Sequence, residues 1–205
     1  KDKNNLDSVL KYLLILFLLQ SIIQITAFIF PSFADLVHFF QKVDVAKKDY
    51  GGIRALGLTG NPFFDLAAGY GFILILYFYS FTLKNLNIFL NSALFLLLFI
   101  GSFFAGRTAF VGLGIGVLYY LFFTSDFFKR LFYLSKFLIM GLGIIFVLYL
   151  LIPENVKDIV ENNLLPFAFE FVYNYMENKE LTTKSSELLN NMYFPISNMT
   201  FIFGD

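Results

Sequence analysis

The sequence contains no cysteine, no tryptophan and a single histidine, His38, in 205 residues. The absence of cysteine excludes disulfides, thiolate metal ligands and a cysteine nucleophile. One histidine is too few for a histidine-based zinc site, and we expect His38 to serve interfacial packing rather than catalysis. An Asp-x-Asp motif is also missing, which argues against a metal-dependent enzyme using nucleotide sugars. We therefore predict no metal and no cofactor.

Charge of either sign is scarce, with 15 Lys and Arg against 15 Asp and Glu. This balance gives no reason to expect nucleic acid as a partner. What the sequence has in excess is apolar surface, because 58% of the residues are hydrophobic. Soluble domains are nearer about 45–50% apolar, so the composition predicts an integral membrane protein.

Five apolar stretches approach the length of about 20 residues that a helix needs to cross a hydrocarbon core. We expect the spans at about 9–30, 62–81, 88–104, 108–123 and 131–152. The predicted fold is all-α, a single membrane domain over residues 1–205 that forms a polytopic bundle of about five transmembrane helices. Because the sequence begins with Lys1 rather than Met, we expect a processed or partial chain, with more spans in the complete protein.

The distribution of Lys and Arg in short loops predicts the orientation of the spans. With the N-terminus inside, the cytoplasmic cations are Lys1, Lys3, Lys11, Lys84, Lys129, Arg130 and Lys136. Both longer polar segments, about 31–61 and 153–205, then lie outside and hold most of the acids. No charged residue lies near the middle of a span, which argues against an ion-coupled transporter. We expect a multi-pass membrane protein with both longer segments outside.

The second polar segment has two possible readings. Aromatic residues from Phe167 to Tyr175 alternate with the period of a strand, but they also fit one face of a helix that starts at Pro166. We favour an amphipathic helix on the membrane surface, with a second helix from about Thr182-Thr183 to Tyr193.

Glycines inside the spans predict close helix packing rather than nucleotide binding. Gly112 and Gly116 have the Gly-x-x-x-Gly spacing that lets two helices approach. We expect the same packing role for Gly69, Gly71, Gly141 and Gly143.

Arg107 is the first candidate for chemistry, since it lies at the tight turn expected between the third and fourth spans. A cation at a membrane edge either extends to the headgroups or has an anionic partner. As an anion site, Arg107 would act with Thr108 and with the N–H groups that open the fourth span.

Arg54 is the second candidate, in a glycine-rich stretch that leads into the second span. A guanidinium can hold two phosphate oxygens, although a solvated loop arginine is the simpler reading. Asp65 follows closely and is expected to pair with an arginine or to act as a general base. Lys184 and Glu187 are weaker candidates for substrate contacts.

Three stretches resemble one family. Arg54–Pro62 is similar to an outer-loop run of Arg, Gly and Asn-Pro before a span, and Gly101–Gly112 resembles a Ser-Arg-Thr or Ser-Arg-Gly turn between spans. Thr182–Pro195, continuing to Phe203-Gly204, resembles the end of a large outer loop with an arginine-bearing helix start. The family is that of the bacterial O-antigen polymerases and O-antigen ligases, and the resemblance covers most of residues 50–205.

The resemblance implies a metal-independent membrane glycosyltransferase. It would polymerise polyprenyl-pyrophosphate-linked repeat units for O-antigen, capsule or exopolysaccharide on the outer face of the bacterial inner membrane. The implied partners are this lipid-linked glycan, membrane lipid and a chain-length regulator protein. Arg54, Arg107 and Asp65 would be catalytic, and the substrate would be bound by Arg54, Arg107, Thr108, Lys184 and Glu187.

The sequence departs from the family pattern in three ways. Gly106 stands where Ser often precedes the arginine, and Lys184 stands where Arg is usual, which loses the bidentate fork. Segment 153–205 has no histidine, which favours a polymerase over a ligase. The alternatives are a ligase of the same family, a non-enzymatic flippase or exporter of lipid-linked oligosaccharides, and a structural membrane subunit.

Overall fold

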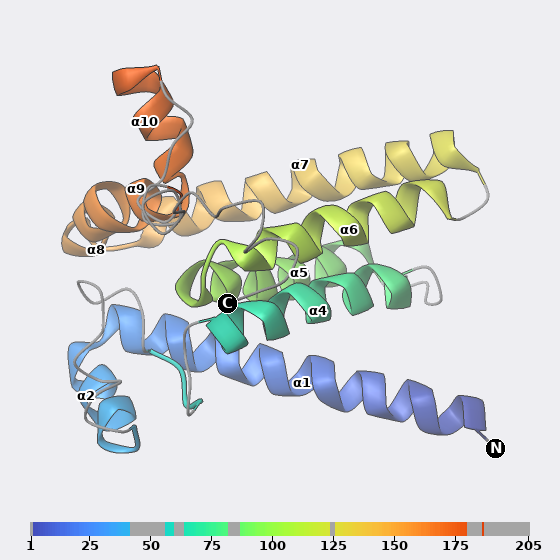
Figure 1. Ribbon diagram of the computed structural model, residues 1–205, viewed down its shortest axis with the longest axis horizontal. Helices are drawn as coiled ribbons and strands as arrows, with labels where there is room; N and C mark the ends of the chain where they lie inside the picture. The colour runs from blue at the N-terminus through green and yellow to red at the C-terminus, as the bar shows by residue number, and fades with distance from the viewer. Residues whose placement is uncertain are drawn as a thin grey trace, which may run out of the picture. The chain divides into compact units, whose positions relative to one another are not determined.

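The computed structural model describes residues 2–41, 56–59, 64–81, 87–123 and 126–179, together with Ser186 (Figure 1). Regular structure in these residues is entirely helical, with no strand among them. The chain divides into two compact units, Lys1–Leu164 and Leu165–Asp205, and each is described by itself. The first unit holds all five of the long helices named below.

The five predicted spans are five helices of the first unit: α1 (Asp2–Ile29), α4 (Phe64–Phe81), α5 (Ile88–Ala105), α6 (Thr108–Phe122) and α7 (Phe127–Leu151). By length and composition α1, α5 and α7 are able to cross a membrane, whereas α4 and α6 are shorter. The 15 residues of α6 rise roughly 22 Å, less than the ~30 Å of a hydrocarbon core. The expectation of an all-α membrane protein is confirmed.

Contacts between the helices give their directions. Helices α5 and α7 run the same way, since Ser92 contacts the backbone of Phe137 and Leu96 lies 3.9 Å from the position a Cβ would take at Gly141. Helix α1 runs with them, because its Phe28 ring packs against Phe104 near the end of α5.

Helices α4 and α6 run together in the opposite direction, as two successive contacts show. Gly112 lies against the backbone of Gly71, and one turn later Gly116 lies against Leu74 and Phe78. We call the end where α4 and α6 begin and α1, α5 and α7 finish the Arg107 end. The opposite end, where α5 and α7 begin, is the Lys129 end.

The glycine prediction is confirmed at the α4–α6 contact. A Cβ at Gly112 would overlap the Gly71 backbone, and a Cβ at Gly116 would come within 2.9 Å of the Phe78 ring. Gly69 is likewise close to the Phe17 ring, and Gly141 makes only ordinary contact. The prediction is wrong for Gly143, where no atom of the described residues lies within 4 Å of an added Cβ.

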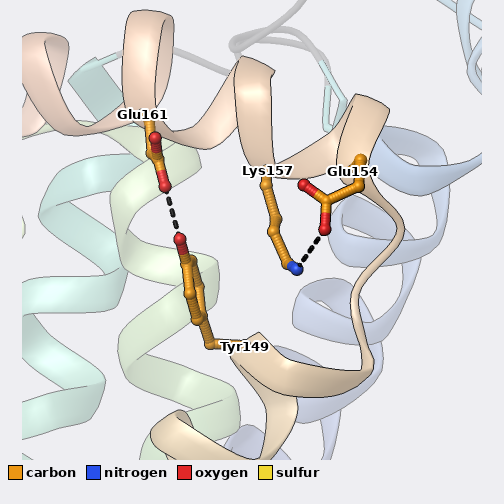
Figure 2. A network of polar contacts seen from close by, with 4 residues as sticks. All are labelled: Tyr149, Glu154, Lys157 and Glu161. Carbon is orange, nitrogen blue, oxygen red and sulfur yellow. Dashed lines mark hydrogen bonds and ion pairs between the residues drawn. The ribbon is translucent and has the colours of Figure 1, made fainter.

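Short helices follow the long ones. In the first polar segment α2 (Pro31–Phe39) begins with a proline, which suits a first helical turn. After Pro153 the chain forms α8 (Glu154–Ile159) and the π-helical η1 (Val160–Leu164). Figure 2 shows that Tyr149 of α7 donates to Glu161 of η1 over 2.5 Å, and that Lys157 donates to Glu154 within α8 over 2.8 Å. That hydrogen bond raises the pKa of Lys157 above its ordinary value.

The second unit contains α9 (Leu165–Ala168) and α10 (Glu170–Asn178). The predicted helix over this segment is therefore confirmed, and the strand alternative is wrong. The structure differs from the prediction in having a turn at Phe169, which divides the helix in two. The second helix predicted from Thr182-Thr183 to Tyr193 lies outside the described residues, apart from Ser186.

Candidate functional site at the Arg107 end

Arg107 lies in a two-residue turn between α5 and α6. Gly106 caps α5 with φ 147° and ψ 164°, and its N–H donates to Ser102 over 3.0 Å. This backbone conformation is essentially confined to glycine. A serine, which the resembled family often carries before its arginine, would be strained here. The turn expected between the third and fourth spans is confirmed, with the Arg107 side chain half-buried.

The turn itself uses N–H groups that a bound anion would need. The Ala109 N–H donates to the Gly106 carbonyl over 3.2 Å, and the Phe110 N–H donates to the Arg107 carbonyl over 3.0 Å. A phosphate at this helix start would therefore depend mainly on the guanidinium of Arg107 and on Thr108, which is exposed. The predicted contribution of backbone donors is correspondingly smaller.

Asp65 and Arg107 lie at the same end of the first unit and at a similar position along the helix axes. Asp65 precedes Gly71 by six residues, and Arg107 precedes Gly112 by five. Because the two glycines are in contact between parallel helices, both charged residues lie roughly 8–9 Å beyond that contact along the helix axes. Asp65 is exposed, in the first turn of α4. The structure thus brings two of the three predicted catalytic residues to one end of the unit.

A buried group of hydroxyls and an amide joins α1 to α4 toward the same end. The Tyr70 hydroxyl donates to Gln24 Oε1 over 2.7 Å and lies 2.8 Å from the Ser21 hydroxyl. All three side chains are at most 1% exposed. We call Ser21, Gln24 and Tyr70 the buried polar cluster. In hydrocarbon such groups need internal partners, so the cluster fixes α1 against α4.

Gly101 of α5 makes room for this cluster. A Cβ at Gly101 would overlap the Ser21 hydroxyl and come within 2.6 Å of the Tyr70 hydroxyl. Three helices therefore meet at the cluster, about one and a half turns inside the Arg107 turn. Our reading of the sequence missed these residues because it searched the spans for charges. The available signal was Gln20 and Gln24, two amides one helical turn apart within an apolar run.

A second set of polar side chains surrounds residues 56–59. Gln41 Nε2 donates to the Gly57 carbonyl over 2.6 Å, and Gln20 Nε2 lies directly against Gly57. The Nε2 atoms of Gln20 and His38 and the hydroxyl of Thr59 are buried, and none hydrogen-bonds to the described residues. Helix α1, the end of α2 and segment 56–59 thus bring amide and hydroxyl groups together near the Arg107 end.

The remaining predicted residues lie outside the described part of the chain: Arg54, Lys184 and Glu187. The closeness of Arg54 to Arg107 therefore stays a prediction. Within the described residues no group of three or more His, Asp or Glu is placed to hold a metal ion.

Comparison with known proteins adds no relative. No family model, no curated protein and no solved structure matches this chain.

Proposed function

We propose that this chain belongs to a polymerase of polyprenyl-pyrophosphate-linked oligosaccharides that works at the extracytoplasmic face of a bacterial inner membrane. The observation that supports the proposal is the position of Arg107 and Asp65 at one end of two parallel helices, at similar height. A cation for a diphosphate and a carboxylate for a hydroxyl proton are then available together. The resemblance of Gly101–Gly112 and Arg54–Pro62 to the O-antigen polymerase and ligase family points to the same reaction.

The proposed reaction is a glycosyl transfer. The bond between the anomeric carbon of the growing glycan and its lipid pyrophosphate breaks, and a bond forms from that carbon to a hydroxyl of a second lipid-linked unit. The hydroxyl proton passes to Asp65, and the lipid pyrophosphate leaves with the bonding electrons. Fixed cations stabilise that developing charge, a role we assign to Arg107 and Arg54 with Lys184 and Thr108. Glu187 would contact the acceptor.

The buried polar cluster supports this assignment in a structural way. It joins α1 to α4 about one and a half turns beneath the proposed site, and Gly101 of α5 lies against it. Catalytic groups have to be held close to their productive geometry. A satisfied hydrogen-bonded cluster in a low-dielectric interior provides such rigidity.

The test is turnover of lipid-linked oligosaccharide by the full-length protein reconstituted with substrate already on the face that carries Arg107. Arg107→Ala should lower the turnover number about 10²–10³-fold, as loss of one transition-state donor does, and Arg107→Lys should recover part of it. Asp65→Asn should lower it about 10²–10⁴-fold. Lys129→Ala, at the opposite end, is the control and should keep wild-type turnover.

Two results would contradict the proposal. Polymer of wild-type length in Arg107→Ala and Asp65→Asn at equal expression would remove both catalytic roles. A wild-type protein that makes no polymer from substrate on the correct face, yet moves lipid-linked oligosaccharide across the bilayer, would be a flippase instead.

A further inference from the structure

An apolar groove of about 720 Å³ runs along one face of α7, beside the first two residues of α5, within the first unit. It is lined by Ile88 and Phe89 of α5 and by one face of α7 between Lys136 and Leu148. Gly143 lies in this wall, and its missing side chain leaves open space where a Cβ would meet nothing. The groove therefore follows one helix that is able to cross a membrane and begins beside the start of another.

Lys136 is the charged residue of the groove lining, and its position in α7 is unusual. It is the tenth residue of the helix, roughly 13 Å along the axis from Phe127. The cations nearer the helix start have partners, because Lys129 pairs with Asp126 at 3.1 Å and Arg130 stacks on Tyr120 at 4.8 Å.

In the described part of the chain, Lys136 contacts an aromatic ring. Its ammonium lies 4.6 Å from the centroid of the Phe132 ring. Within the described residues no carboxylate pairs with it. An ionisable side chain at this depth of a span is costly without a counter-charge. An anionic ligand in the groove would supply that counter-charge, because Lys136 lines the groove.

The dimensions of the groove fit one leaflet of a bilayer. From Lys136 to Leu148 α7 advances roughly 18 Å, close to half of a hydrocarbon core of ~30 Å. A chain that starts at Lys136 and follows α7 to Leu148 would occupy this length. An acyl chain of a phospholipid has this reach, whereas a polyprenyl chain is longer than one leaflet is deep.

We infer that the α5–α7 groove binds an anionic phospholipid, with one acyl chain along α7 and the headgroup phosphate against Lys136. Basic pockets between transmembrane helices bind anionic headgroups in this way. The site lies toward the Lys129 end and rests only on the membrane-spanning fold. It is therefore independent of the glycosyltransferase proposal.

The experiment measures lipid retention on the purified protein by native mass spectrometry after exchange into phosphatidylglycerol or phosphatidylcholine. Wild type should retain phosphatidylglycerol about fivefold better, the ratio that one cation near a membrane surface provides. Lys136→Gln should abolish this preference, and Lys136→Arg should keep it. Gly143→Leu should fill the groove and lower the retention of both lipids.

Gly114→Leu is the matched control, since Gly114 is also a helical glycine with no atom within 4 Å of an added Cβ. It lies on α6, away from the groove, and should retain lipid as wild type does. The proposal is overturned if wild type shows no headgroup preference, if Lys136→Gln keeps it, or if Gly143→Leu and Gly114→Leu behave alike. Displacement of phosphatidylglycerol by an equal concentration of polyprenyl phosphate would also overturn it.

Discussion

Gly106 shows how a single residue determines the geometry of the candidate site. Its φ of 147° lies in a region that other residues enter only under strain. We therefore expect Gly106→Ala to destabilise the protein by about 1–3 kcal/mol and to shift the α5–α6 turn that carries Arg107. The measurement is the midpoint of thermal unfolding in detergent, monitored by far-UV circular dichroism.

Gly114→Ala provides the control for this substitution. Gly114 is helical and open, so an alanine there should leave the midpoint equal or higher. Equal midpoints for Gly106→Ala and wild type would show that the turn does not have this conformation.

The buried polar cluster is tested by removing its partners in pairs. Tyr70→Phe deletes the hydroxyl that donates to Gln24 over 2.7 Å, and Gln24→Leu deletes the acceptor. Hydrogen bonds between membrane helices couple by about 0.6 kcal/mol on average and up to about 1.7 kcal/mol. We expect a double-mutant cycle of unfolding free energies to give a coupling in this range.

A neighbouring tyrosine serves as the reference for this cycle. The Tyr77 hydroxyl donates to the Asn91 carbonyl and lies two turns further along α4, roughly 10 Å away. Tyr77→Phe and Gln24→Leu should therefore be additive. The cluster would be refuted as a unit if both cycles gave the same coupling.

Among the elements, the α4–α6 pair depends on two glycines in contact. A methyl group at Gly112 would overlap the backbone of Gly71, where no side chain is available to move aside. We expect Gly112→Ala to cost about 1–3 kcal/mol, the usual range for a substitution that forces backbone to shift. Gly114→Ala, two residues away on the opposite face, should cost nothing measurable, with thermal midpoints in detergent as the readout.

The long helices are predicted well from the sequence, because the length of an apolar run is a local property of the sequence. All five apolar runs are helices with ends within a few residues of those expected, except that α1 and α7 begin earlier. The alternation from Phe167 to Tyr175 was ambiguous because both periods fit short aromatic runs. The break at Phe169 is a finding of the structure alone.

The candidate site was less predictable because its geometry is non-local. The sequence indicates that Arg107 lies in a turn, but the matching height of Asp65 depends on the contact between Gly71 and Gly112. The link from Tyr70 to Gln24 spans 46 positions, and an apolar pattern does not say which helix faces which. For the same reason Gly143 was assigned to packing, although it opens onto a groove.

The orientation of the helix bundle in the membrane is predicted by the charges at the two ends of its helices. Lys129, Arg130 and Lys136 all lie in the first ten residues of α7, so the positive-inside rule predicts that the Lys129 end is cytoplasmic. The Arg107 end would then face outward. Helix α6, at roughly 22 Å, is the shortest of the five long helices that would separate the two sides.

The natural absence of cysteine makes this question directly testable. Single cysteines at Asp65, Thr108 and Lys129 all replace exposed side chains, and the parent chain gives no background. In intact bacterial spheroplasts a membrane-impermeant maleimide should label Asp65→Cys and Thr108→Cys but not Lys129→Cys. All three should react after permeabilisation. Equal labelling of Thr108→Cys and Lys129→Cys in intact spheroplasts would mean that α6 does not separate the two sides. Asp65 and Arg107 would then have no defined face from which to reach a lipid-linked glycan.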